Sequence, residues 1–263
     1  MKQAAMISPR WVLLLVLALM LAGCASDGPL KRDSDRGGLA QRDRAAEVNT
    51  ELAVGYMREG HLDVAVEKAE RAIEINPRYS PARHVYALLL DQLGEVAKAG
   101  REFEAAIRYA DKRDSDLANN YGAFLCRQGE YDKAQAMFSR ALENPLYKTP
   151  EFALTNSGRC YERAGAFEQA LSRYEQARQA ERTHGPATLG MARVYYELGE
   201  YQKAFELMQQ YSARNRHTPD SLATAIRIDR AVGNEQSLAN HRLILRGRFP
   251  DSPEAEALER GDL

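Results

Sequence analysis

The fold can be read from residues 119–141, NNYGAFLCRQGEYDKAQAMFSRA. Gly129 separates two segments in which apolar residues recur with the period of an α-helix. The small residues Gly122 and Ala134 let two helices approach closely, and the large Phe138 can fill the gap beside them. A glycine after the first helix supplies the left-handed backbone conformation that ends it. The stretch therefore predicts a pair of closely packed helices.

The same pattern recurs along the chain. Equivalent glycines are separated by 34, 35, 36, 34 and 34 residues, and the sixth match is the weakest; they are Gly60, Gly94, Gly129, Gly165, Gly199 and Gly233. A 34-residue unit with these small and large positions resembles the tetratricopeptide repeat (TPR). The alternative is a generic helical bundle in which the spacing is coincidental.

Stacked repeats bury each other's faces, so we expect an all-α, right-handed superhelical TPR solenoid with six repeats and about twelve helices. The expected domain covers residues 45–263. Its repeats lie at approximately 46–79, 80–114, 115–150, 151–184, 185–218 and 219–252. The segment Asp251–Leu263 either continues as a short C-terminal capping helix or frays.

The N-terminal segment reads as an export signal. Eleven apolar residues, 11–21, follow Lys2 and Arg10, a run too short to span a bilayer. The run ends in Leu21-Ala22-Gly23-Cys24, which resembles a bacterial lipobox. The resemblance implies that residues 1–23 are removed and that Cys24 is lipidated. The alternative is an ordinary signal peptide with a chance cysteine.

Residues 24–44 are polar and charged without an apolar period, and we expect a lipidated, flexible tether there. In Gram-negative lipoproteins an aspartate directly after the lipidated cysteine retains the protein at the inner membrane. Here that residue is Ala25. The resemblance therefore favours an outer-membrane, lipid-anchored protein that faces the periplasm.

Composition and motifs argue against several functions. Without residues 1–23 the chain has 34 basic and 37 acidic side chains, so no basic surface predicts nucleic-acid binding. The five histidines are scattered, and the chain has no glycine-rich phosphate loop, no G-x-S-x-G and no C-x-x-C motif. We therefore expect no enzymatic activity, no metal site and no cofactor.

The two remaining cysteines, Cys126 and Cys160, occupy positions twelve and ten of successive repeats, in the first helix of each. Successive first helices lie side by side in a TPR solenoid. An offset of two residues corresponds to about 200° of helix rotation and about 3 Å of rise, which turns the two side chains toward each other. Because exported proteins meet oxidising conditions, we predict a disulfide. The alternative is two buried free thiols.

In TPR solenoids the first helix of each repeat lines the concave side, and the ninth position of the repeat points there. These positions read Val54, Leu88, Ala123, Arg159, Arg193 and Arg227, and nearby inner positions include Met57, His84, Asn119, Asn120 and Asn156. Asparagines can bond a peptide backbone, and arginines can bind carboxylates through two bonds. We predict a groove with an apolar end and a basic end for a partly apolar, partly acidic partner. Alternatively, the arginines pair with acids of the solenoid such as Glu162 and Glu197.

A more specific resemblance lies in residues 119–165. The runs Asn144-Pro145-Leu146-Tyr147 and Thr149-Pro150-Glu151, with the N-N-Y-G-x-F-L-C segment, resemble the type IV pilus biogenesis and stability lipoproteins of the PilF/PilW, pilotin-like family. The resemblance implies a lipoprotein whose partner is the secretin subunit of the pilus apparatus, and paired cysteines at Cys126 and Cys160. Because solenoids of this length are often monomers, we expect a monomer. The alternatives are a TPR lipoprotein scaffold of another envelope assembly machine and a regulatory subunit.

Overall fold

A computed structural model describes residues 31–263, and these residues form helices without strands. The expected all-α repeat fold is thus confirmed. The predicted leader and Cys24 lie outside the described residues. The helices are α2 Lys31–Glu59, α3 Leu62–Ile75, α4 Ser80–Gln92, α5 Val96–Tyr109, α6 Ser115–Arg127, α7 Tyr131–Leu142, α8 Pro150–Arg163, α9 Phe167–Ala180, α10 Gly185–Glu197, α11 Tyr201–Ser212, α12 Pro219–Val232, α13 Glu235–Arg248 and α14 Pro253–Arg260.

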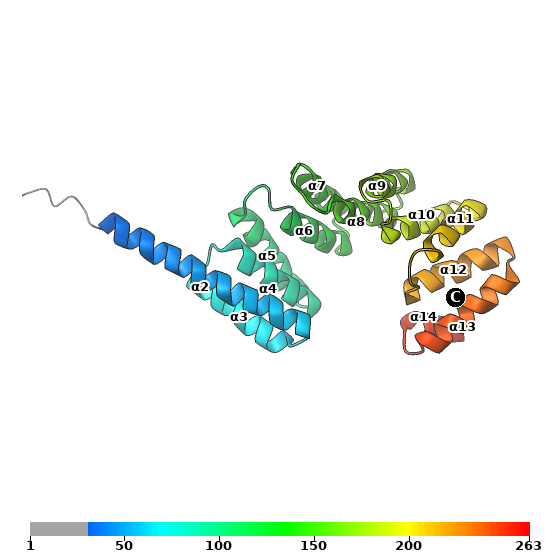
Figure 1. Cartoon of the computed structure of the whole chain (residues 1–263), viewed down its shortest axis with the longest axis horizontal. Coiled ribbons are helices and arrows are strands. Elements are labelled where there is room, and N and C mark those ends of the chain that lie inside the picture. Colours follow the sequence, from blue (N-terminus) through cyan, green and yellow to red (C-terminus); the bar gives the residue numbers. More distant parts are fainter. Residues whose placement is uncertain (1–30) are drawn as a thin grey trace, which may run out of the picture.

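Twelve of these helices form six hairpins, from α2–α3 to α12–α13, and α14 follows alone. The hairpins stack into a curved solenoid (Figure 1). In the middle of the curve α6, α8 and α10 lie on the inner side, and α7 and α9 lie on the outer side. The even-numbered helices, the first of each hairpin, therefore supply the inner surface.

Glycines end the first helices as the sequence predicted. The six repeat glycines have φ angles between 72° and 83°, a region that other residues rarely adopt. At Gly233 the left-handed residue directly follows α12 and its amide donates to the Arg230 carbonyl. A left-handed residue reverses the chain within a few residues, so each second helix packs back along the first.

The core of each repeat follows the small-and-large pattern. Small residues such as Ala99 and Ala134 are fully buried where the helices of a hairpin touch, and Phe103 and Phe138 fill the space beside them. Tyr174 is the extreme case, because its ring lies against the backbone of both Gly158 and Gly190. One large side chain on α9 thereby joins α8 to α10, and so the fourth repeat to the fifth.

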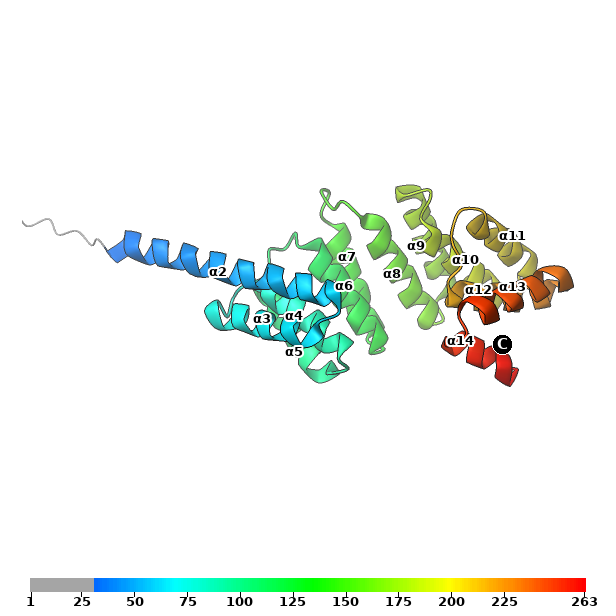
Figure 2. The same cartoon turned by 60° about the horizontal axis from the view of Figure 1, so that its bottom comes forward.

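The two ends of the solenoid differ. At the C-terminal end α14 packs on α12 and α13, and Leu263 is buried in the same apolar cluster. Of the two expected outcomes for Asp251–Leu263, the structure therefore shows the capping helix (Figure 2). At the N-terminal end no helix precedes α2 among the described residues, and the side chains of Val48 and Leu52 stay 48% and 44% exposed.

Helix α2 differs from the sequence-based expectation. It begins at Lys31, so residues 31–44, expected to be flexible, are helical and project beyond the repeats (Figures 1 and 2). Among residues 40–59 of this helix the first buried residue is Ala46. Once the packed part of a helix has formed, each further residue adds a hydrogen bond without a new nucleus. The helix can therefore extend through a segment that has no apolar period.

Candidate functional site

The apolar end of the predicted groove lies on the first two repeats. Val54 and Met57 on α2 are half-buried and pack on the cluster of Ala53, Ala65 and Leu89. Leu88 on α4 is also half-buried, but it packs on the next cluster along the solenoid. These side chains are therefore shared between the core and the inner surface.

Polar side chains join neighbouring inner helices in the middle of the solenoid. Asn120 on α6 lies 3.0 Å from the His84 ring on α4, and the Asn156 amide on α8 donates to the Asn119 carbonyl oxygen on α6 at 3.0 Å. Asn119 is only 7% exposed, so its side chain already has its partner within the fold. The structure thus gives Asn119 a role in stacking the repeats, while Asn120 and Asn156 stay half-buried at the surface.

The position of His84 makes stability depend on pH. Burial lowers the pKa of the His84 imidazole below 6.5, although the carboxylates of Asp114 and Asp116 act in the opposite direction. The folded state therefore binds fewer protons at His84 than the unfolded state. Its contribution to stability is complete above about pH 6.5, the value in the unfolded chain, and is lost as the pH falls from there through the lower pKa of the folded state.

We expect the wild type to lose more stability than His84→Gln between pH 8 and pH 5, because glutamine keeps an amide for Asn120 but does not titrate. Urea denaturation at several pH values measures the difference. Parallel pH profiles for the two proteins would contradict the assignment.

The basic end of the groove is built around Arg193 on α10. Its Nε donates to Glu162 Oε1 on α8 at 2.8 Å, and its Nη1 donates to Asp220 Oδ2 on α12 at 3.0 Å. The Tyr174 hydroxyl also donates to Glu162, at 2.5 Å. Burial, and then the Glu162 carboxylate, raise the pKa of Tyr174, so its hydroxyl keeps the proton it donates. Arg193 is thus held by acids on two neighbouring helices, α8 and α12, and Tyr174 on α9 supports Glu162.

These groups line a hollow on the inner side of α8, α10 and α12, formed by Arg159, Glu162, Arg163, Arg193 and Asp220. A second hollow between α6 and α8 shares Arg159 and Arg163 with the first and adds Arg127 and Asn156. Arg159 and Arg163 are exposed, and within residues 40–263 no carboxylate lies within ion-pair distance of either. Of the exposed arginines in the hollows, these two have no acidic partner among those residues, whereas Arg127 pairs with Asp91.

The three arginines of the expected row differ in their partners and in their places on the inner surface. Arg193 pairs with Glu162, as the alternative interpretation held, and not with Glu197. Arg159 lines the hollow without an acidic partner among the described residues. Arg227 is exposed on α12 but lines neither hollow.

Sequence reasoning missed two members of the site. Arg163 lies four residues after Arg159 on α8, so the helical period alone could have placed both on one face. Asp220 comes from the following repeat, and its contact with Arg193 depends on how the repeats rotate relative to one another. No sequence signal marks that contact.

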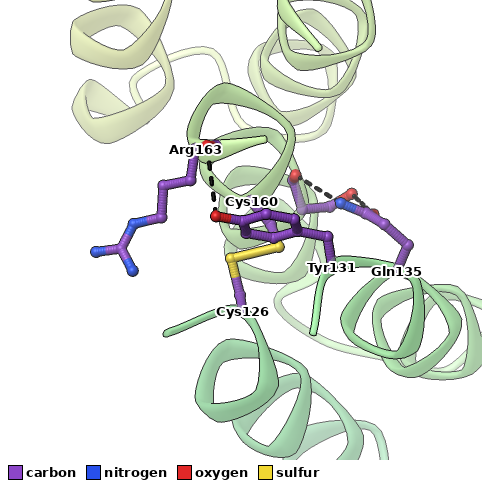
Figure 3. The surroundings of a disulfide bond; sticks show 6 residues. Cys126, Tyr131, Gln135, Cys160 and Arg163 are labelled. Atoms are coloured by element: carbon purple, nitrogen blue, oxygen red, sulfur yellow. Dashed lines mark hydrogen bonds between the residues drawn. A yellow bond between two sulfur atoms is a disulfide. The ribbon is translucent and has the colours of Figure 1, made fainter. Parts of the chain in front are cut away.

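Beside the hollows, Cys126 on α6 and Cys160 on α8 are joined by a disulfide, with their Cα atoms 5.6 Å apart (Figure 3). Two polar contacts from α7 to α8 flank the bond. The Tyr131 hydroxyl donates to the Arg163 carbonyl at 3.4 Å, and Gln135 donates to the Ser157 carbonyl at 3.1 Å. The covalent bond and these contacts fix α8, and with it the arginines of the site, against the third repeat.

Within residues 31–263 no cluster of three or more histidine, cysteine, aspartate or glutamate side chains could hold a metal ion. In the same part of the chain, no helix has the length and apolar character to cross a bilayer.

Comparisons with known proteins agree with this architecture. A family model described as a tetratricopeptide repeat matches residues 50–116 and 125–181, and another with the same description matches residues 162–225. Together they cover most of the solenoid.

Individual proteins are similar over nearly the whole chain. The type IV pilus assembly protein PilF of Pseudomonas aeruginosa is 26% identical over 253 residues, which are 95% of this chain and 98% of that protein. A crystal structure of PilW, described as a widely conserved type IV pilus biogenesis factor, covers 81% of this chain at 29% identity with a TM-score of 0.74, and 97% of its own chain is matched. A structure of Pseudomonas aeruginosa PilF covers 84% at 25% identity with a TM-score of 0.70, and 99% of its chain is matched.

Proposed function

Because this chain is a tetratricopeptide repeat protein related to the PilF and PilW type IV pilus assembly proteins over most of its length, we propose that it is the pilotin of a type IV pilus secretin. As a pilotin it brings the secretin, the gated ring through which the pilus emerges, to the outer membrane and promotes its multimerisation. The scaffold family is non-enzymatic, so the work is done by binding.

The observation that carries the proposal is the extent of the similarity to a pilus assembly protein. The match to PilF leaves only 5% of this chain and 2% of that protein unaligned, so it includes more than the repeats. A repeat domain that served an unrelated machine would share the solenoid but not the segments on either side of it.

In this proposal the N-terminal part attaches the protein to its membrane. A lipidated Cys24 that carries more than one acyl chain holds the protein stably at a membrane, because each buried methylene contributes about 0.8 kcal/mol. Helix α2 begins at Lys31, about 20 Å along its axis before the buried Ala46. The anchor thereby keeps the binding surface close to the membrane while leaving it accessible, which raises the local concentration of the partner there.

The inner surface supplies recognition. Its first two repeats offer the half-buried apolar side chains of Val54, Met57 and Leu88, and its later repeats offer Arg159 and Arg163. We propose that a secretin segment with an apolar part and an acidic part lies along this surface. Exposed arginines that lack internal partners lose no existing bond when they bind such a segment.

The decisive experiment uses cells that lack this protein. We expect heat- and detergent-resistant secretin multimers to disappear or to move to the inner membrane, as seen by envelope fractionation and blotting. Wild-type protein restores them and Cys24→Ser does not. Arg159→Glu restores them less well than its control Arg101→Glu, which reverses an exposed arginine on the outer helix α5.

Two outcomes contradict the proposal. Unchanged multimers together with lost pili place the protein at a later step of pilus assembly. Unchanged multimers and normal pili leave a scaffold for another cell-envelope machine as the function, and the proteins that co-purify with the chain then identify that machine.

A further inference from the structure

The hollow between α8, α10 and α12 has a surplus of positive charge that the fold only partly neutralises. Three guanidinium groups line it, those of Arg159, Arg163 and Arg193, against the two carboxylates of Glu162 and Asp220. The two acids differ in exposure. The Glu162 side chain is 17% exposed, whereas that of Asp220 is 61% exposed at the mouth of the hollow.

Glu162 is a fixed part of the site. It accepts two bonds from Arg193, through Nε and Nη2, and a third from the Tyr174 hydroxyl. A carboxylate with three donors in a half-buried position loses all of them if it moves, so it stays in place. Arg193 is in consequence oriented with its Nη1 directed away from Glu162 and into the hollow.

Asp220 meets that free side of Arg193, and its attachment is weak. Within residues 40–263 its carboxylate forms one ion pair, the 3.0 Å contact with Arg193 Nη1. Breaking this pair costs little, because water solvates the exposed Asp220 carboxylate when it separates and Arg193 keeps its two bonds to Glu162. Asp220 also lies in the first turn of α12, where the helix dipole stabilises a carboxylate whether or not it is paired. Separating Asp220 from Arg193 therefore costs little free energy.

We propose that this hollow is a carboxylate-binding subsite that the chain's own Asp220 occupies in the free protein, and that a partner's carboxylate displaces Asp220 to bind Arg193 together with Arg159 and Arg163. The inference rests on the proposed groove function and names the chemistry of one part of it. Asp220 acts as an internal competitor. It lowers the affinity of the hollow for every acidic segment. Tight binding is then limited to segments that also contact the apolar end of the groove.

The test compares binding of fluorescein-labelled peptides by anisotropy. The probe has four Glu-Ser repeats and an amidated C-terminus, and its neutral counterpart has four Gln-Ser repeats. We expect Asp220→Asn to bind the acidic probe about 2–5-fold more tightly than the wild type, because the competing carboxylate is gone. Asp220→Glu keeps a competing carboxylate and stays near the wild-type affinity.

The matched control is Asp132→Asn, which removes an exposed first-turn aspartate of α7 outside both hollows. Equal tightening by this control would reduce the effect to a change in net charge and would overturn the proposal. Tightening toward the neutral peptide as well would also overturn it.

Arginine variants separate this inference from the proposed groove. If Arg159→Gln and Arg163→Gln weaken binding of the acidic probe while Asp220→Asn leaves it unchanged, the basic groove stands and the internal competitor is wrong. If none of the three variants changes binding, the hollow takes no carboxylate and both ideas are wrong at this site. The secretin assay in cells is scored independently, so its failure alone leaves the subsite intact with another acidic partner.

Discussion

We expect Gly190→Ala to lower the free energy of unfolding by about 3 kcal/mol. A Cβ at Gly190 would lie 2.3 Å from Cζ of Tyr174, well inside van der Waals contact. The ring cannot retreat, because its other side lies against Gly158, where an added Cβ would also meet it at 2.8 Å. The helices α8 and α10 must then separate, or Tyr174 must leave the core.

Either response also disturbs the binding site. Tyr174 holds Glu162, and Glu162 holds Arg193, so displacement of the ring removes the support of the basic hollow. Urea denaturation followed by circular dichroism measures the stability. Gly55→Ala is the matched control, because it makes the same change inside helix α2, where nothing lies within 4 Å of the added Cβ.

The control should gain up to about 1 kcal/mol, since alanine favours the helix over glycine. Equal stability of Gly190→Ala and the wild type would show that the ring does not pack against this backbone.

The second large effect concerns the bond between Cys126 and Cys160. We expect its reduction, or the double change Cys126→Ser and Cys160→Ser, to cost about 3–4 kcal/mol, the value for closing a loop of this length in the unfolded chain. The bond spans 34 residues and joins the third repeat to the fourth. Both sulfur atoms lie in the apolar core, so serine hydroxyls would in addition be buried there.

Denaturation with and without reductant measures this cost. The double variant is its own control, because its stability should not respond to reductant. Alkylation of the denatured, non-reduced wild type should leave both cysteines unlabelled. Label at both positions, with no effect of reductant on stability, would mean that the protein carries free thiols.

Much of this fold could be predicted because its decisive contacts are local. Gly129 and its equivalents end helices through their own backbone, and the small and large positions pack within one hairpin. The 34-residue period then fixes the stacking of neighbours. The pairing of Cys126 with Cys160 followed from the same logic, since only the relative rotation of two adjacent helices was needed.

The parts that escaped prediction depend on longer-range geometry. Asp220 reaches Arg193 across a repeat boundary, and Tyr174 reaches Gly190 in the following repeat. Both contacts depend on the superhelical rotation, which the repeat pattern does not specify to the precision of a side chain. The helical course of residues 31–44 escaped for another reason. An exposed helix that extends a packed one needs no apolar period, so hydrophobic patterning does not detect it.

The covalent link between Cys126 and Cys160 also determines how this solenoid responds to tension. In the function proposed above, the protein is held at a membrane through its N-terminus and bound to a large partner through its later repeats, so it is pulled along its chain. Under such a load the force passes directly from α6 to α8 through the sulfur atoms, and α7 lies outside the load path. Roughly 120 Å of chain, at about 3.5 Å per residue, is thereby withheld from extension. The first repeats can yield and lengthen the tether, while the arginines of α8 stay in register with the helix that precedes them.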